Sequence, residues 1–407
     1  MARAFGVLRH GGFGYYLLAR FLATLAVQML VVAVGWQVYE LTHDPLDLGL
    51  IGLSQFLPFI VLILPAGHMA DHSDRRRIVA GCFALQAAGA LLMLGYTRAG
   101  LPQVWPVFAI MGLFGVARAF SMPAAQALLP NVVPPEHYGS AVPLSSSANQ
   151  VARITGPALG GLLYFAGAEA VYAAVALLLA AAFALILAAR AASRAPRPRV
   201  PVSWQNLLSG LAFVRSRPVV LGAISMDLFA VLFGGATALL PAYAGDILHA
   251  GPVGLGFLRT ASGVGAALCG LVLALRPIQR QVGRWMFGGV AAFGLATVVF
   301  GVSTSLALSL AALVVLGAAD MVSVYVRQML VQLATPDAIR GRVSAVNSVF
   351  IGASNEVGEF ESGVTAAWWG VVPAVVVGGV ATVIVALAWA RLFPGLWKMA
   401  RFPEPAS

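Results

Sequence analysis

Residues 115–128, GVARAFSMPAAQAL, recur 202 positions later as residues 317–330, GAADMVSVYVRQML, and this offset is close to half of the 407-residue chain. The likeness continues on both sides, so one structural unit occurs twice. Because 60% of the residues are hydrophobic and only 10% are charged, the repeat predicts a membrane transporter with two similar halves and a substrate path between them. The identities pair Gly115, Ala117, Ser121, Gln126, Leu128, Pro134, Gly139, Ser146, Gly156 and Gly161 with Gly317, Ala319, Ser323, Gln328, Leu330, Pro336, Gly341, Ser348, Gly358 and Gly363.

Composition excludes several classes of protein. A soluble domain carries about a quarter charged residues, so this chain meets mostly lipid. Its net charge of +10 would suggest a nucleic-acid partner, but the basic residues lie between apolar segments and form no run or stripe. Cys82 and Cys269 lie far apart in apolar stretches, which predicts buried free thiols rather than a disulfide or a metal site.

Apolar runs of about 20 residues predict twelve membrane spans. We therefore expect an all-α membrane protein with two six-helix bundles, residues 1–190 and 219–393, related by a pseudo-twofold axis. Residues 191–218 form a linker and 394–407 a tail, and the first span is too long for a cleavable signal. The spans lie near 13–40, 48–67, 78–97, 104–128, 141–166, 170–190, 219–244, 253–275, 284–303, 305–333, 342–366 and 370–392.

The distribution of Lys and Arg predicts the orientation. If the N-terminus is cytoplasmic, nineteen of the 25 basic residues lie on that side and only Arg98 lies on the other, which places both termini in the cytoplasm. The linker includes an amphipathic stretch from Trp204 to Phe213 that suits the inner membrane surface, and it acts either as a simple tether or in regulation. Five basic residues lie inside spans: Arg20, Arg118, Arg153, Arg259 and Arg327.

The connection after the second span resembles the signature loop of the major facilitator superfamily. Gly67, Asp71, Arg75 and Arg76 match it in register, whereas His72 replaces a basic residue and Asp74 a glycine. The resemblance predicts a cytoplasmic gate in which Asp71 pairs with arginines or with the positive end of a helix. Alternatively, the arginines only set the topology.

The fifth span carries a second motif. Gly156, Pro157, Gly160 and Gly161 resemble the Gly-Pro-x-x-Gly-Gly motif of exporters and antiporters in this superfamily. Small residues on one face let a neighbouring helix approach closely, and the proline removes a backbone donor. The motif therefore predicts either a gating helix or an ordinary packing seam.

Acidic residues inside spans are the candidates for proton coupling, because buried charges in membranes usually face a cavity, a partner or a proton path. Glu356 and Glu359 share a helical face, which favours a shared proton, while Glu361 points elsewhere. Alternatively, each acid is neutralised statically, as Glu356 would be by Arg153. Asp227 lies in the seventh span. Asp320 in the tenth span occupies the repeat position of Arg118, so the two residues are expected to face one cavity and to exchange partners as it opens.

Motifs of other energy sources and of catalysis are absent from the sequence. The histidines form no metal-ligand spacing, and no phosphate-binding loop with its lysine is found. We therefore expect no cofactor, no metal and no enzymatic activity, and a transport cycle driven by an ion gradient.

Several longer segments resemble the bacterial enterobactin exporter family. They include Val34–Tyr39, Asp227–Ala236 and Gly341–Gly363. The resemblance implies proton-driven export of a catecholate siderophore or another amphipathic small molecule from a bacterial inner membrane, by a monomer. An uptake symporter for a small metabolite and a non-transporting receptor or scaffold remain open. Besides Asp227, Asp320, Glu356 and Glu359, the predicted cavity residues are Gln28, Trp36, Gln37, Glu40, Arg118, Asn347 and Asn355.

Overall fold

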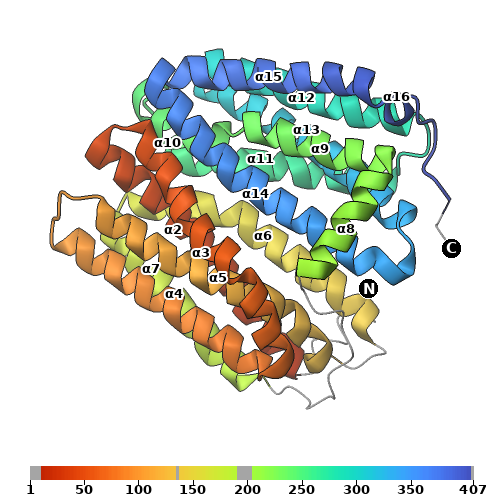
Figure 1. Ribbon diagram of the computed structural model, residues 1–407. Helices are drawn as coiled ribbons and strands as arrows, with labels where there is room; N and C mark the ends of the chain where they lie inside the picture. Colours follow the sequence, from red (N-terminus) through yellow and green to blue (C-terminus); the bar gives the residue numbers. More distant parts are fainter. Residues whose placement is uncertain (1–10, 134–136, 190–203, 405–407) are drawn as a thin grey trace. The chain divides into compact units, whose positions relative to one another are not determined.

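The computed structural model describes residues 11–133, 137–189 and 204–404, and nearly all of them are helical (Figure 1). The order of the long helices follows the predicted spans, one helix to a span except for the seventh. They are α2 (Gly11–Thr42), α3 (Pro45–His72), α4 (Arg75–Arg98), α5 (Trp105–Val132), α6 (Tyr138–Tyr164), α7 (Ala168–Ala188), α9 (Pro218–Phe233), α11 (Gly251–Leu275), α12 (Val282–Val302), α13 (Leu306–Ala334), α14 (Asp337–Trp369) and α15 (Val371–Leu392). Shorter helices are α8 (Trp204–Ser216), α10 (Leu240–Ala242) and α16 (Pro394–Trp397).

Ten helical segments among the described residues are long and apolar enough to cross a membrane. The two long helices outside this set are α6 and α14, which match the predicted fifth and eleventh spans but carry more polar residues. Large apolar side chains are also exposed on the helices, such as Leu177 at 72% and Leu275 at 75%. Such apolar surfaces are rare on soluble proteins, and they fit a protein surrounded by lipid.

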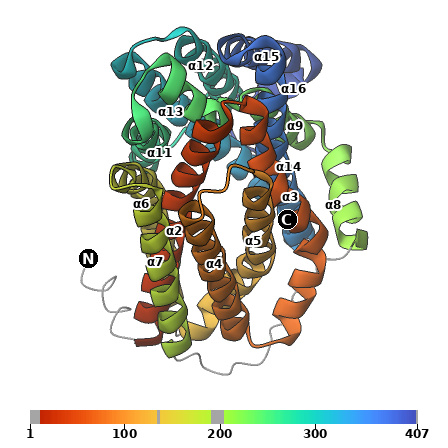
Figure 2. The same ribbon diagram turned by 90° about the vertical axis from the view of Figure 1, so that its left-hand side faces the viewer.

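The chain divides into two compact units. Unit 1 comprises residues 1–43, 54–199 and 251–260, and unit 2 comprises residues 44–53, 200–250 and 261–407. In unit 1, α2 packs on α6 and α7, and α4 packs on α5 and α7 (Figure 2). In unit 2, α12 packs on α13 and α15, and α9 packs on α14 and α15. The core of unit 2 includes Met226, Met286, Phe287 and Leu330, all buried.

The sequence repeat is visible as a repeated contact. In unit 1, Gly161 of α6 faces Gly256 of α11, and a methyl group on Gly161 would lie 3.0 Å from the Cα atom of Gly256. In unit 2, Gly363 of α14 faces Gly49 of α3, and a methyl group there would lie 2.9 Å from the Cα atom of Gly49. Gly161 and Gly363 are partners in the repeat, so both units use the same glycine for the same close helix approach.

The seventh span differs in detail from the prediction of one helix over residues 219–244. Helix α9 ends at Phe233, and the chain continues through a 3₁₀ turn (Ala236–Leu239), α10 and a π turn (Tyr243–Ile247). The interruption falls at Gly234 and Gly235. A side chain on Gly235 would meet the carbonyl oxygen of Gly358 at 2.5 Å, so the break allows α14 to pass close by.

The amphipathic stretch predicted at Trp204–Phe213 forms α8, which extends to Ser216. Its Val214 is buried in a cluster with Val220, Ile224, Val343 and others of unit 2. The C-terminal end of α8 is therefore fixed to the helices of unit 2. The rest of the predicted linker, residues 191–203, lies outside the described residues.

Candidate functional site

A buried charged cluster lies between α9 and α13 in unit 2. Arg327 donates a hydrogen bond from Nη1 to Oδ2 of Asp227 at 2.6 Å, and the two side chains are only 3% and 5% exposed. Asp320, Ser323 and Arg327 recur at intervals of three and four residues, so they share one face of α13. Asp320 lies 14 residues into α13, which is ~21 Å from the start of the helix. The cluster is thus deep within a span.

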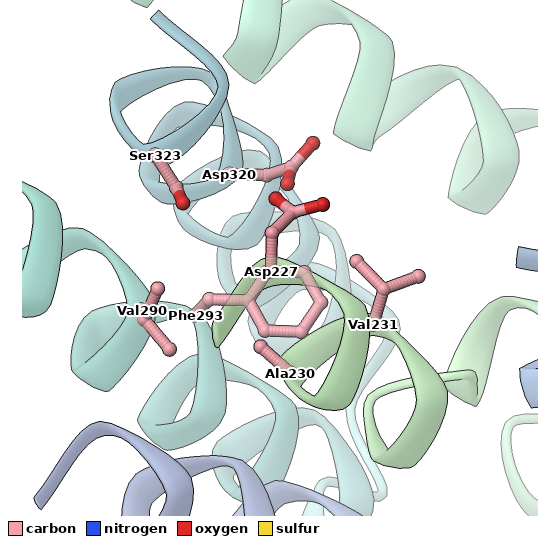
Figure 3. A pocket seen from close by; sticks show the side chains of 7 residues that line it. All are labelled: Asp227, Ala230, Val231, Val290, Phe293, Asp320 and Ser323. Carbon is pink, nitrogen blue, oxygen red and sulfur yellow. The ribbon is translucent and has the colours of Figure 1, made fainter. Parts of the chain in front are cut away.

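Asp320 completes the cluster with a second carboxylate. Its side chain points toward that of Asp227 (Figure 3), and it interacts electrostatically with both Asp227 and Arg327. Two carboxylates therefore share one guanidinium, which leaves one negative charge uncompensated when both are ionised. In a low-dielectric interior such a charge is costly, and binding of one proton removes it.

A small cavity lies beside the two carboxylates. Its volume is about 10 Å³, close to the smallest volume that holds one water molecule. Figure 3 shows the Phe293 ring below the carboxylates and the Ser323 hydroxyl on the Asp320 side. A water molecule in this position could relay a proton to either acid. The lining residues are Asp227, Ala230, Val231, Val290, Phe293, Asp320 and Ser323.

The cluster holds polar atoms that have no hydrogen-bond partner. The Nε atom of Arg327 and the hydroxyl of Ser323 are buried, and neither forms a hydrogen bond with any described residue. A guanidinium has five N–H donors, so Arg327 has donors left for Asp320 or for water. Buried polar groups without partners are rare and call for an explanation, and a change of partner during function would supply one.

The second predicted pair of acids also lies together. A methyl group on Gly52 of α3 would lie 2.9 Å from Oε2 of Glu359 and 3.7 Å from Oε2 of Glu356. Both carboxylates therefore converge on one point within unit 2, on the face expected from their spacing. Glu361 lies two residues beyond Glu359 and so does not share this helical face; its backbone carbonyl oxygen accepts a hydrogen bond from the Thr365 hydroxyl.

The other predicted cavity residues of unit 2 differ in exposure. Asn347 is buried, and its Oδ1 atom has no hydrogen-bond partner among the described residues. Asn355 is exposed on α14. The structure therefore places only Asn347 in a protein interior.

In unit 1, two predicted cavity residues make hydrogen bonds between helices. Gln37 accepts a hydrogen bond from the Tyr172 hydroxyl at 2.6 Å and donates one to Thr97 at 3.0 Å, which joins α2, α4 and α7. Glu40 is exposed and accepts a hydrogen bond from the Tyr164 hydroxyl at 3.5 Å. Gln37 thus has a clear structural role.

The remaining candidates of unit 1 are only partly buried. Trp36 and Gln28 lie on α2, and Gln28 is next to Gly156 of α6. The guanidinium of Arg118 lies over the Phe59 ring, 4.9 Å from its centroid. The exchange of partners between Arg118 and Asp320 remains a prediction.

In the signature loop, residues 74–76 form hydrogen bonds that cap the ends of neighbouring helices. Asp74, which replaces the usual glycine, caps α4 by accepting a hydrogen bond from the backbone N–H of Arg76 at 2.9 Å. Arg75 donates to the carbonyl of Ala70 at 3.1 Å, and Arg76 donates to the carbonyls at the end of α7, including that of Ala189 at 3.1 Å. Gly67 lies near the end of α3, and the side chain of Asp71 lies outside the described set.

The Gly-Pro-x-x-Gly-Gly motif forms a close packing seam on α6. A methyl group on Gly156 would meet Cβ of Gln28 at 2.5 Å, and one on Gly160 would meet Cα of Met29 at 2.8 Å. Pro157 lies within the uninterrupted helix, and its carbonyl oxygen faces Gly256. Both of the predicted roles, gate and seam, require this close approach.

Arg327 was not among the predicted site residues, although its position inside the tenth span was evident. The sequence feature that indicates it is the spacing of seven residues between Asp320 and Arg327, which is two helical turns and places both on one face. Both cysteines are free thiols; Cys82 is buried as predicted, whereas Cys269 is only partly buried. Within the described residues no group of three or more His, Cys, Asp or Glu side chains is placed to hold a metal ion.

Comparison with known proteins identifies the family. A family model described as transmembrane secretion effector matches residues 2–400. The chain belongs to this family of the major facilitator superfamily. It is therefore a multi-pass membrane transporter and not an enzyme.

Three relatives of this major facilitator transporter differ in how much they share with it. The uncharacterized MFS-type transporter YfiS of Bacillus subtilis is 26% identical over 368 residues, covering 86% of this chain and 85% of its own. The enterobactin exporter EntS of Escherichia coli is 25% identical over 341 residues, covering 83% and 81%. The macrolide efflux protein A of Streptococcus pyogenes is 31% identical over 137 residues, covering 33% and 34%.

Two solved structures share the fold of this transporter. A bacterial homologue of the human lysosomal transporter Spinster has a TM-score of 0.74 at 14% identity and covers 97% of this chain and 98% of its own. The nucleoside transporter NupG has a TM-score of 0.74 at 15% identity and covers 95% and 99%. At these identities the likeness supports the fold alone.

Proposed function

We propose that the chain is a proton-coupled secondary active exporter, which moves a siderophore or a similar amphipathic small molecule or drug out of the cytoplasm by alternating access. The family and the efflux proteins among its relatives support export. The observation that carries the proton coupling is the buried pair of Asp227 and Arg327 with Asp320 beside it. Such a cluster responds to one proton with a change of ion pairing.

The two aspartates have separate roles in the proposed transport cycle. Asp227 accepts a short, charge-assisted hydrogen bond from Arg327, which favours its ionised form. Asp320 forms no hydrogen bond with a described residue and is the better proton acceptor. A proton from the outer side of the membrane binds the Asp320 carboxylate. In the substrate-loading state this proton is released to the cytoplasm, and Arg327 then contacts Asp320 in place of Asp227.

The proposed transporter has two similar halves. Twelve spans form two bundles, residues 1–190 and 219–393, joined by residues 191–218 with a tail at 394–407. The bundles rock about a central path in the bacterial inner membrane, with both termini in the cytoplasm and the protein acting as a monomer. The loop at Gly67, Asp71, Arg75 and Arg76 and the motif at Gly156–Gly161 are the proposed gates.

Glu356 and Glu359 are the competing proton carriers. They converge on Gly52, and two carboxylates so placed also favour a shared proton. The two proposals differ in the variants that they predict to be inactive. If Glu359→Gln abolishes substrate-dependent proton release and Asp320→Asn does not, the glutamate pair carries the proton.

The function is tested in membrane vesicles with three probes that share a fluorophore and differ in charge: dansylglycine, dansylglycinamide and dansylcadaverine. In everted vesicles with an acidic interior, an exporter accumulates at least one of them beyond the level in vesicles that lack the protein, which corrects for passive trapping of the amine, and nigericin in potassium buffer abolishes the difference. Accumulation only in right-side-out vesicles would support an uptake symporter instead. Accumulation in neither, with folded protein present, would support a receptor or scaffold.

A further inference from the structure

The first bundle contains a set of arginines in its membrane-spanning helices. Helices α2, α5 and α6 of unit 1 carry Arg20, Arg118 and Arg153, and the single acidic residue in these helices is Glu40. Glu40 lies 20 residues beyond Arg20 on α2, which is ~30 Å along the helix, and it is bonded to Tyr164. These three helices therefore carry an excess of positive charge within the membrane.

Arg20 and Arg153 lie on helix faces that are turned toward each other. The Thr24 hydroxyl on α2 donates a hydrogen bond to the Asn149 side chain on α6 at 3.1 Å. Arg20 lies one turn before Thr24, and Arg153 lies one turn after Asn149. Since residues four apart share a helical face, both arginines lie on the seam between α2 and α6.

Arg118 reaches the same region from α5. The Tyr16 hydroxyl on α2 donates a hydrogen bond to the carbonyl of Ala125 at 3.0 Å, and Tyr16 lies one turn before Arg20. Ala125 lies about two turns after Arg118, so Arg118 is on the side of α5 that faces α2. Arg153 interacts electrostatically with both Arg118 and Arg20, which places Arg153 within electrostatic range of each of the other two cations.

Neither Arg20 nor Arg153 forms a hydrogen bond or ion pair with a described residue, and the Nε atom of Arg20 is buried. Arg20 is partly buried and Arg153 is exposed on the surface of its helix. Like charges repel one another more strongly in a membrane span than in bulk water, and ionisable groups in spans mark substrate or ion pathways. A guanidinium binds carboxylate and phosphate oxygens with two parallel hydrogen bonds and stacks on aromatic rings. An anion is the ligand that balances this arrangement.

We propose that Arg20, Arg118 and Arg153 form a binding site for the anionic group of an amphipathic substrate, with Thr24, Gln28 and Asn149 as its neutral hydrogen-bonding neighbours. The inference rests on the proposed export function and specifies its substrate class: an aromatic or otherwise apolar molecule with a carboxylate or a similar oxyanion. Phe59, which stacks on Arg118, suits the apolar part.

Binding to the purified full-length transporter in phosphatidylcholine nanodiscs tests the site without any proton gradient. The wild type is expected to bind dansylglycine about tenfold more tightly than dansylglycinamide, and dansylcadaverine more weakly still, as one or two charge-assisted hydrogen bonds imply. Arg20→Gln and Arg153→Gln should each remove most of this preference and leave the affinity for dansylglycinamide unchanged. Arg20→Lys and Arg153→Lys keep the positive charge and should retain part of the preference for dansylglycine.

Arg98→Gln is the matched control, because Arg98 is 64% exposed and pairs with Glu169 at 2.9 Å. Equal affinities of the wild type for all three probes, or an unchanged preference in both glutamine variants, would overturn the proposal.

Adding phosphatidylglycerol separates the sources of the anion: loss of dansylglycine binding at 20 mol% would mean that the arginines hold a lipid headgroup, and the substrate assignment would fail. Proton-driven export of dansylcadaverine alone would refute the anion site and leave the export function intact, whereas anion-selective binding without export in vesicles would refute only the export function.

Discussion

Arg327 and Asp227 form an ion pair between α13 and α9 with an N to O distance of 2.6 Å, almost fully shielded from solvent. Asp320 stands beside this pair on α13 and shares its cation. The pair joins two helices of one unit, so any change in its protonation acts directly on how these helices pack.

Removing Arg327 alone should destabilise the protein more than removing both partners of the pair. Arg327→Gln leaves the buried Asp227 without its cation, at a cost of about 3–5 kcal/mol, whereas Asp227→Asn costs less because Arg327 keeps Asp320 as a counter-ion. The double variant Asp227→Asn with Arg327→Gln leaves no net change in charge and should recover a large part of that loss. Thermal unfolding of the purified protein, followed by tryptophan fluorescence, measures the difference. A double variant less stable than both single variants would show that the pair contributes packing rather than charge compensation.

Asp320→Asn should remove the pH dependence of substrate binding. If substrate loading releases a proton from Asp320, linkage requires that the affinity of the wild type rises with pH. The asparagine variant has no proton to release there, so its affinity should stay constant between pH 5.5 and 8.5, and accumulation against a gradient should be lost. Binding titrations with dansylglycine across this range check the sign.

The control for that experiment is Glu169→Gln, which changes an exposed carboxylate paired with Arg98. Its affinity should follow the same rise with pH as the wild type. A rising profile in Asp320→Asn would move the proton to another group, with Glu359→Gln as the next variant to measure.

The sequence predicted the helices well because each apolar run had to satisfy its own backbone hydrogen bonds within the membrane. Asp227 and Asp320 were also recognised as buried acids. Their common partner Arg327 was not, because periodicity shows which residues share a helix face but not which helix lies opposite. The break at Gly234 and Gly235 was missed for the same reason, since its cause is the backbone of α14.

Gln37 shows what the sequence leaves open about a predicted cavity residue. In the structure its amide is bonded to Tyr172 and Thr97 of two neighbouring helices, and its role in a cavity stays a prediction. A satisfied buried amide and a substrate contact look alike in sequence, because both place one polar residue among apolar ones. Only the identity of the neighbours distinguishes them.

Arg76→Ala should lower stability more than Arg77→Ala, although the two residues are adjacent. Arg76 donates to the carbonyls of Leu187 and Ala189 at the end of α7, where a cation also favours the helix dipole. We expect a loss of about 1–2 kcal/mol for such charged hydrogen bonds. Arg77 is 82% exposed, and its contact with Asp74 is 3.6 Å long. Thermal unfolding of both variants in the same detergent compares them, and equal shifts would contradict the capping role.

Gly161→Ala and Gly363→Ala should impair transport to a similar degree, because the two glycines are repeat partners with the same contact. A methyl group at either position would lie within 3.0 Å of the Cα atom of the facing glycine. The helices must then separate, at a cost of about 1–3 kcal/mol for overpacking. The matched control is Gly81→Ala on α4, where nothing lies within 4 Å of the added methyl group, and helix propensity predicts a gain of up to ~1 kcal/mol. Vesicle accumulation and thermal unfolding are measured on all three variants. If alanine impaired them at only one of the two repeat glycines, the shared role would be contradicted.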